Sequence, residues 1–133
     1  MSERDTICAL ASGQPPAAIC IIRLSGDAIW KLAGALLDCG LPEPRRATLT
    51  KFRDEDANLI DEGLALFMPG PHSYTGEDTL ELYLHGGPAV IEHAISTLIK
   101  EPNVRMAEPG EFTRRAFEAG KIDLTEAEGV ADI

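Results

Sequence analysis

Runs of apolar residues separated by Gly, Pro and Asp clusters predict short strands and helices along this chain. Residues 6–12 and 17–25 are nearly continuous apolar runs on either side of the turn cluster 13–16. Such runs are typical of central strands that are buried on both faces. Residues 79–85 alternate strictly between apolar and polar positions, which predicts a strand with one core face and one polar face.

Three further segments extend this pattern of strands. Residues 47–54 and 58–70 predict an antiparallel pair, and residues 103–108 predict a short strand. The Gly- and Pro-containing segment 69–78 is too long for a tight hairpin, so we expect a shaped loop there.

Apolar residues at three- and four-residue spacing predict four helices. The first runs from Ser25, the expected N-cap, to Gly40, and the second begins at Pro88. A third covers residues 109–119, and a fourth begins near Asp123. The positions expected to face the core are Ile29, Ala33, Leu36 and Leu37 in the first helix, Ile91, Ala94, Ile95 and Leu98 in the second, and Phe112, Ala116 and Ala119 in the third.

The order of these elements predicts the fold class. Strands and helices do not alternate regularly, so we expect an α+β fold rather than a doubly wound one. In this fold a mixed or antiparallel sheet carries helices on one face. The helix expected from Asp123 has no stop signal before Ile133, which predicts that the natural protein continues.

Composition then narrows the possible functions. The chain has 133 residues, of which 44% are hydrophobic, enough for one domain with a sizeable core. The net charge of −10 argues against a domain that grips nucleic acid, because phosphate contacts need clustered Lys and Arg. Cys8, Cys20 and Cys39 form no CxxC pair and are expected to be buried, reduced thiols of a cytoplasmic protein.

Several kinds of site and segment are not expected. No apolar run reaches the length of about 18 residues that a membrane-spanning helix needs. His72, His85 and His93 lack the spacing of metal ligands, so we expect no metal site. No G-x-x-x-x-G-K-[ST] motif occurs in the chain, which excludes a P-loop within it.

Three charged residues occupy unusual positions for their chemistry. Arg23 shares a strand face with Ile19 and Ile21, so its guanidinium needs an anionic partner unless it emerges at the strand end. Glu81 lies in the middle of a strand and could accept a planar pair of donors, lie on a half-solvated face, or pair with Arg23. Lys121 follows Gly120, where a lysine can support a helix C-terminus or bind a ligand.

Thr79, Gly86 and Gly87 are secondary candidates for lining a pocket. The two glycines precede a helix start, where backbone N–H groups can meet an anion, although close packing explains them equally well. From the residues alone, the chain is an α+β module with a small-ligand pocket and no visible catalytic machinery.

Four segments carry a resemblance to a known family. These are "DTICALAS", "AAICIIRLSG", "DEGLALFMPGPHSYTGEDTLELYLHGGP" and "AEPGEFTRRAFEAGKIDLTEAEGVADI". In this order they closely resemble the N-terminal part of the bacterial tRNA modification GTPases of the MnmE/TrmE family. The resemblance runs from Asp5 to Ile133. It is specific, because three motifs occur together: "PGP-x-S-[FY]-TGED" in the loop 69–78, "HGGP" and "PGEFT-x-RAF".

This resemblance implies a fold, a ligand and partners. The family's N-terminal domain resembles the folate-binding domain of aminomethyltransferases, forms homodimers and binds 5-formyl-tetrahydrofolate or a related reduced folate. Matching motifs place the folate-binding role on Arg23, Glu81 and Lys121. The domain would cover residues 1–120, and residues 121–133 would begin a helical domain.

For the whole parent protein, the resemblance implies modification of the tRNA wobble uridine at C5 in the cytoplasm. GTP, Mg²⁺ and K⁺ would bind outside this chain, which lacks the GTPase domain and so hydrolyses no GTP. The FAD-dependent protein MnmG (GidA) and tRNA would be partners of the full protein.

Two other functions remain open from the sequence. One is a folate-dependent aminomethyltransferase-like fragment, and the other is a purely structural dimerisation module. The second draws on residues 12–16, which read SGQPP where the family reads like PPGRG. His72 and Tyr74 also replace the Asn and Phe of the family loop.

Overall fold

The structure, a computed structural model, describes residues 5–123 of the chain. Its strands are β1 (Thr6–Leu10), β2 (Ala17–Ser25), β3 (Thr48–Arg53), β4 (Leu59–Met68), β5 (Thr79–Gly86) and β6 (Val104–Met106). Its helices are α1 (Ile29–Leu36), α2 (Pro88–Ile99) and α3 (Glu111–Glu118). The helix predicted to begin near Asp123 falls on residues 124–133, outside the described range.

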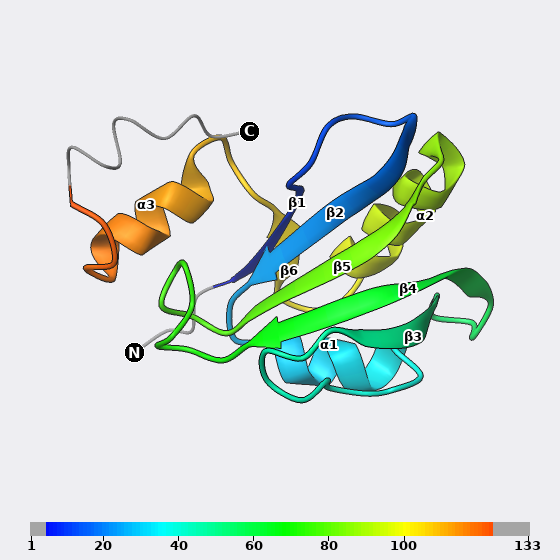
Figure 1. Cartoon of the computed structure of the whole chain (residues 1–133), viewed down its shortest axis with the longest axis horizontal. Helices are drawn as coiled ribbons and strands as arrows, with labels where there is room; N and C mark the ends of the chain where they lie inside the picture. The colour runs from blue at the N-terminus through cyan, green and yellow to red at the C-terminus, as the bar shows by residue number, and fades with distance from the viewer. Residues whose placement is uncertain (1–4, 124–133) are drawn as a thin grey trace.

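The six strands form one mixed sheet in the order β3-β4-β5-β2-β1-β6 (Figure 1). Neighbouring strands are antiparallel, except that β6 runs parallel to β1. The chain reaches β6 through α2. This arrangement confirms the predicted α+β class and its mixed sheet.

One face of the sheet carries the main hydrophobic core and is covered by α1 and α2. In β2 and β5 the core side chains alternate along the strand and lie opposite one another across the register: Cys20, Ile22, Leu24, Leu80, Leu82 and Leu84. Each fully buried aliphatic side chain contributes roughly 1.5–3 kcal/mol relative to an exposed one. The predicted core positions of α1 are all buried, and in α2 Ile91, Ala94 and Leu98 are buried while Ile95 is partly so.

The predicted burial on both faces is correct for β1 and wrong for the first half of β2. Thr6, Ile7 and Cys8 are fully buried, whereas Ala17–Ile19 are exposed and Ile19 retains 59% of its accessible surface. The difference arises because α3 covers the sheet near the end of β2 and not near its beginning.

The first helix is shorter than predicted, because Ser25 is a strand residue rather than an N-cap. Ser25 pairs with Thr79 as the last residue of β2, and α1 begins at Ile29. The backbone N–H of Ala28 instead donates to the Thr6 hydroxyl at 2.8 Å. Gly40 has a positive φ of 68° but lies beyond the helix end at Leu36, so it does not terminate the helix.

The third helix lies on the other face of the sheet, which corrects the expectation that all helices cover one face. Arg115 of α3 donates to the backbone oxygen of Ser25, whose side chain points away from the α1 and α2 core. Phe112 and Ala116 are buried as predicted, but Ala119 is exposed. None of the three described helices combines the length and apolar character that crossing a membrane requires.

Candidate functional site

Arg23 and Glu81 meet on the second face of the sheet, the face that α1 and α2 leave uncovered. They are direct cross-strand partners in the register of β2 and β5. Nε and Nη2 of Arg23 lie 2.8 and 2.7 Å from the same oxygen, Oε2 of Glu81. The side chains are 33% and 10% exposed, so the pair is largely removed from water. The structure thus confirms the pairing left open by the sequence, and the half-solvated alternative for Glu81 is wrong.

Tyr83 adds a third member to this pair. Its hydroxyl donates to Oε1 of Glu81 at 2.6 Å. This hydrogen bond, together with burial and the negative charge of Glu81, raises the pKa of Tyr83 to about 12. The strict alternation of residues 79–85 places Tyr83 on the same face as Glu81, but the sequence assigned it no role. The alternation Glu81-Leu82-Tyr83 was the available signal, because residues two apart on a strand lie side by side.

The Arg23–Glu81–Tyr83 cluster stands within an apolar surface. Leu66 and Leu64 of β4 lie opposite Glu81 and Tyr83 in the register, and Ile21 of β2 lies opposite Tyr83. Partial shielding by these side chains strengthens the ion pair and raises the cost of leaving either charge unpaired. A ligand that binds here therefore has to replace the polar contacts that it displaces.

Lys121 is held by the way in which α3 ends. The N–H groups of Gly120 and Lys121 donate to the backbone oxygens of Phe117 and Ala116 at 3.0 and 2.9 Å. With Gly120 at a φ of +74°, these two bonds form a Schellman motif, as predicted for a glycine after the helix. Within the described residues no hydrogen bond or ion pair involves the Lys121 ammonium group.

The side chain of Lys121 lies against the loop 69–78. Its Cε is 3.5 Å from the position that a Cβ would take on Gly76, and the Cβ of Ala119 is 2.8 Å from that position. The structure therefore brings Arg23 and Glu81 into direct contact and places Lys121 beside the neighbouring loop, without a bond to either of them.

The secondary candidates occupy opposite ends of β5. Thr79 is buried at its start, two residues before Glu81, and donates to the backbone oxygen of Glu77 at 3.2 Å. Gly86 and Gly87 lie at the other end, where a Cβ on Gly86 would clash with the backbone of β2 and Gly87 is the N-cap of α2. Close packing therefore accounts for Gly86 but not for Gly87, where a Cβ would meet only Val90 at 3.9 Å, and neither glycine joins the Arg23–Glu81–Tyr83 cluster.

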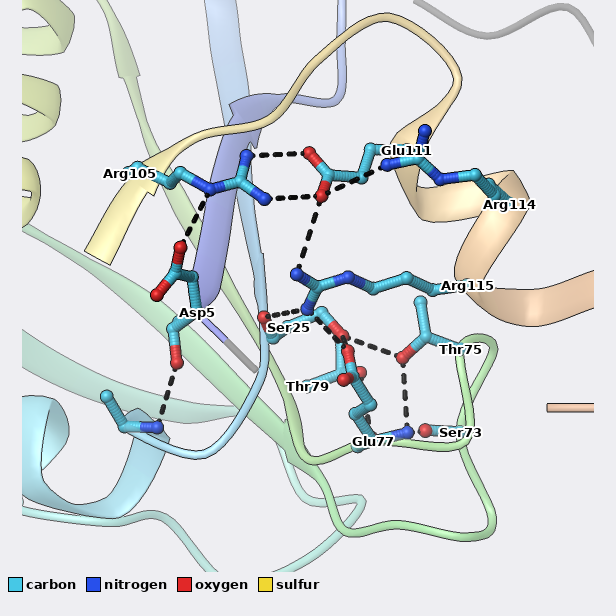
Figure 2. A network of polar contacts seen from close by, with 12 residues as sticks. Asp5, Ser25, Ser73, Thr75, Glu77, Thr79, Arg105, Glu111, Arg114 and Arg115 are labelled. Carbon is cyan, nitrogen blue, oxygen red and sulfur yellow. Dashed lines mark hydrogen bonds and ion pairs between the residues drawn. The ribbon is translucent and has the colours of Figure 1, made fainter. Parts of the chain in front are cut away.

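A second polar cluster fastens α3 to β6. Arg105 donates through Nη1 and Nη2 to the two oxygens of Glu111, at 2.8 and 2.6 Å, and its Nε donates to Asp5 (Figure 2). Glu111 is 2% exposed. The hydrogen bonds from Arg105 lower the pKa of Glu111 to about 2 despite its burial, and Glu111 raises the pKa of Arg105.

Arg115 extends this cluster to the loop 69–78. Its Nη1 donates to Glu77 at 2.9 Å and to the Ser25 backbone at 3.4 Å, and its Nη2 lies 3.4 Å from Glu111. Figure 2 shows the Arg115 guanidinium between these groups. The Ser25 hydroxyl donates to Glu77 at 2.7 Å and shares a hydrogen bond with Thr75.

Sequence reasoning missed this buried network. It assigned Ser25 to a helix cap and gave Glu111 and Arg115 no role in a site. The available signal was that both charges lie beside Phe112 and Ala116 on the buried side of the predicted helix.

A hollow beside the network, of about 440 Å³, is lined by Asp5, Arg105, Glu111, Arg114, Arg115 and Glu118. Its lining carries three carboxylates and three guanidinium groups. This balance does not favour an anionic ligand, so the hollow is a weaker candidate site than the Arg23–Glu81–Tyr83 cluster.

Comparison with known proteins identifies the family. The family model of the GTP-binding protein TrmE N-terminus matches residues 6–121. A tRNA modification GTPase MnmE from Hyphomonas neptunium is 68% identical over 133 residues, which is 100% of this chain and 30% of the relative. The protein of the same name from Brucella ovis is 50% identical over 132 residues, 99% of this chain and 30% of the relative.

A more distant relative shows the same coverage. The tRNA modification GTPase MnmE of Sodalis glossinidius is 48% identical over 133 residues, 100% of this chain and 29% of the relative. The chain thus spans about 30% of the length of these curated relatives. From the match of the family model and the identity to these relatives, this chain belongs to the TrmE N-terminal family, the N-terminal domain of tRNA modification GTPases of the MnmE type.

Proposed function

We propose that this chain binds a reduced folate of the 5-formyl-tetrahydrofolate type, within a GTPase that modifies tRNA wobble uridine at C5. The observation that carries the proposal is the shielded Arg23–Glu81 pair on the uncovered face of the sheet. Its two residues are those for which the resemblance to the family implies folate binding. The Arg23 side chain of this pair keeps 33% of its accessible surface, so the pair is not sealed inside the core.

The donor set fits a pterin ring. A pterin offers an N–H and an exocyclic amine side by side, and a carboxylate can accept such a pair. A carboxylate has about four acceptor positions, and three donors from Arg23 and Tyr83 already point at Glu81. Paired recognition by Glu81 therefore requires at least one of these donors to move. A released Arg23 guanidinium would then be free to bind a carbonyl or formyl oxygen of the ligand.

Lys121 supplies the second cation in this proposal. Ser25 and Thr79, on the same face as Arg23 and Glu81, lie next to α3 and its adjoining loop. Lys121 follows α3 and contacts that loop at Gly76. It would bind a carbonyl or carboxylate oxygen at this end of the site.

The proposed function includes a homodimer formed through this domain. The second face exposes Ile19, Leu49 and Leu64, of which Leu49 and Leu64 lie opposite one another in the register. Large exposed apolar side chains gathered on one face are typical of an interaction surface. The net charge of −10 argues that other parts of the full protein bind tRNA. GTP hydrolysis and the contact with MnmG would also belong to the full protein.

The proposal is tested by titrating the chain with 5-formyl-tetrahydrofolate in a calorimeter. Replacing Glu81 by Ala should weaken binding by about 1–3 kcal/mol, roughly 5- to 150-fold, because the ligand loses a charged acceptor. Glu81→Gln keeps the shape, removes the charge and should also weaken binding. Glu43→Gln is the matched control, since Glu43 forms an exposed ion pair with Arg46 at 3.3 Å.

The outcomes separate the rival functions. No heat at hundreds of micromolar protein and ligand would rule out folate binding. A chain that forms a dimer but binds no folate would support the purely structural dimerisation module. Turnover of an aminomethyl donor without GTP would instead support the aminomethyltransferase-like reading.

A further inference from the structure

We propose that Arg115 and Glu77 are positioning residues that set where the Lys121 ammonium group lies relative to the Arg23–Glu81 pair. This inference rests on the folate site proposed above and names the contacts that hold one part of it in place. Neither residue has to touch the ligand for the proposal to hold.

The polar network around Arg115 joins separate segments of the chain. Arg115 lies on α3, Ser25 ends β2, and Thr75 and Glu77 belong to the loop before β5. The contacts among them range from 2.7 to 3.4 Å and lie between α3 and the second face of the sheet (Figure 2). Arg115 is 5% exposed, so competition from water for its contacts is slight.

Gly76 connects this network to Lys121. Gly76 stands between Thr75 and Glu77, and both neighbours are held by the Ser25 hydroxyl. Gly76 in turn packs against Ala119 and Lys121, at the end of the helix that carries Arg115. The ion pair between Arg115 and Glu77 therefore fixes how the loop and the end of α3 are placed against one another.

Strands β2 and β5 connect the network to the Arg23–Glu81 pair. Ser25 lies two residues after Arg23, and Thr79 lies two residues before Glu81 on the same face. Two residues along a strand span about 7 Å. The network therefore borders the proposed site, and a shift of the loop or of α3 would alter the spacing between Lys121 and Arg23.

A purely structural role explains less of this arrangement. Phe112 and Ala116 already give α3 an apolar anchor. A buried ion pair adds little net stability over apolar packing, because desolvation offsets most of the attraction between the charges. Its directional contacts do, however, fix a single placement of the loop against the helix, which a ligand site needs.

A double-mutant cycle tests the inference in the 133-residue chain. Glu77→Gln keeps the side-chain shape and removes the charge that faces Arg115. It should weaken binding of 5-formyl-tetrahydrofolate about three- to tenfold, which lies in the lower part of the range for coupled residues in contact. In a Lys121→Met background the same change should have little further effect. Equal losses in both backgrounds, or no loss in either, would overturn the inference.

A ligand-free measurement separates this inference from the folate proposal. Glu77→Gln should speed hydrogen exchange at the Lys121 amide and shift the NMR signals of the Lys121 side chain. Glu43→Gln, which alters only an exposed pair, should leave both unchanged. If the unaltered chain binds no folate, the proposed function fails while these signals still decide whether Glu77 positions Lys121.

Conservative replacement at Arg115 completes the test. Arg115→Lys keeps the charge but loses the fork that spans Glu77 and Glu111. It should shift the Lys121 signals less than Arg115→Met does, with thermal unfolding confirming that both variants fold. Unchanged Lys121 signals in a folded Arg115→Met variant would also refute the inference.

Discussion

At the residue scale, the site depends on one carboxylate held by three donors. Arg23 occupies one oxygen of Glu81 and Tyr83 occupies the other. Sequence position alone marked Arg23 and Glu81 as unusual, because a charge on an apolar strand needs a partner. Tyr83 was assigned no role because a tyrosine on a strand face has many ordinary uses.

Tyr83 makes a testable contribution to stability at high pH. Its pKa is raised from 10.0 to about 12, so the folded state holds the hydroxyl proton more tightly than the unfolded state does. The resulting stability should be fully present below pH 10 and should be lost as the pH rises through 12. Urea unfolding across this range should show that decline in the unaltered chain and a smaller one in Tyr83→Phe.

Tyr74→Phe is the control for this experiment. Tyr74 is partly exposed and its hydroxyl bonds the neutral Thr113 hydroxyl at 3.2 Å, so its loss should leave the alkaline decline in place. An identical decline in the unaltered chain and in Tyr83→Phe would contradict the assignment.

At the element scale, α3 differs from the other helices in how it is attached. α1 and α2 are held by apolar stripes that could be read from the spacing of their residues. α3 adds buried charges to a short apolar stripe, and its position on the second face depends on Arg105, Glu111 and Arg115. Periodicity predicted that this helix exists but not which face it covers, because both faces of the sheet offer apolar groups.

Glu111 should make the attachment of α3 sensitive to acid. Its pKa is lowered from 4.5 to about 2, chiefly by hydrogen bonds from Arg105. The stability it contributes should be present above pH 4.5 and should be lost as the pH falls towards 2. Because Arg105 is partly exposed, solvent screening reduces this contribution to on the order of 1–2 kcal/mol.

Acid unfolding followed by circular dichroism checks this expectation. Glu111→Gln should lower stability at pH 7 and flatten the loss between pH 4.5 and 2. Glu108→Gln, in the segment that leads into α3, changes a carboxylate that is 67% exposed and should leave the acid profile unaltered. A Glu111→Gln profile parallel to that of the unaltered chain would show that Glu111 does not carry the effect.

At the scale of the whole molecule, the two faces of the sheet serve different purposes. One face builds the core with α1 and α2, and the other carries the candidate site, α3 and exposed apolar side chains. The chain spans about 30% of its relatives' length, and the homodimer proposed above would use the second face.

The proposed dimer can be tested on this second face. Leu64→Glu places a charge beside Tyr83 and Leu49 and should convert a dimer into a monomer, since burying an unpaired charge at an interface is costly. Analytical ultracentrifugation measures the change. Trp30→Glu is the control, because Trp30 is 65% exposed but lies on α1, on the core side of the sheet. A Leu64→Glu variant that stays dimeric would place the interface elsewhere.

The fold class, most strand and helix positions, and the core faces of α1 and α2 could be predicted from the sequence alone. Local periodicity decides these features, because side chains repeat every two residues on a strand and every 3.6 on a helix. The Schellman end of α3 at Gly120 also depends only on neighbouring residues. The start of α1 could not be predicted in this way, because Ser25 belongs to β2 and bonds to residues of a distant loop.

Which charged residues pair with one another depends on how the whole chain folds. Arg23 and Glu81 are 58 positions apart, and Arg115 and Ser25 are 90 apart. Their pairing depends on strand register and on the face that α3 covers, which are set by the packing of the whole chain rather than by any one segment. The same packing joins Arg23 and Glu81 in an ion pair and places the side chain of Lys121 against Gly76 of the loop 69–78.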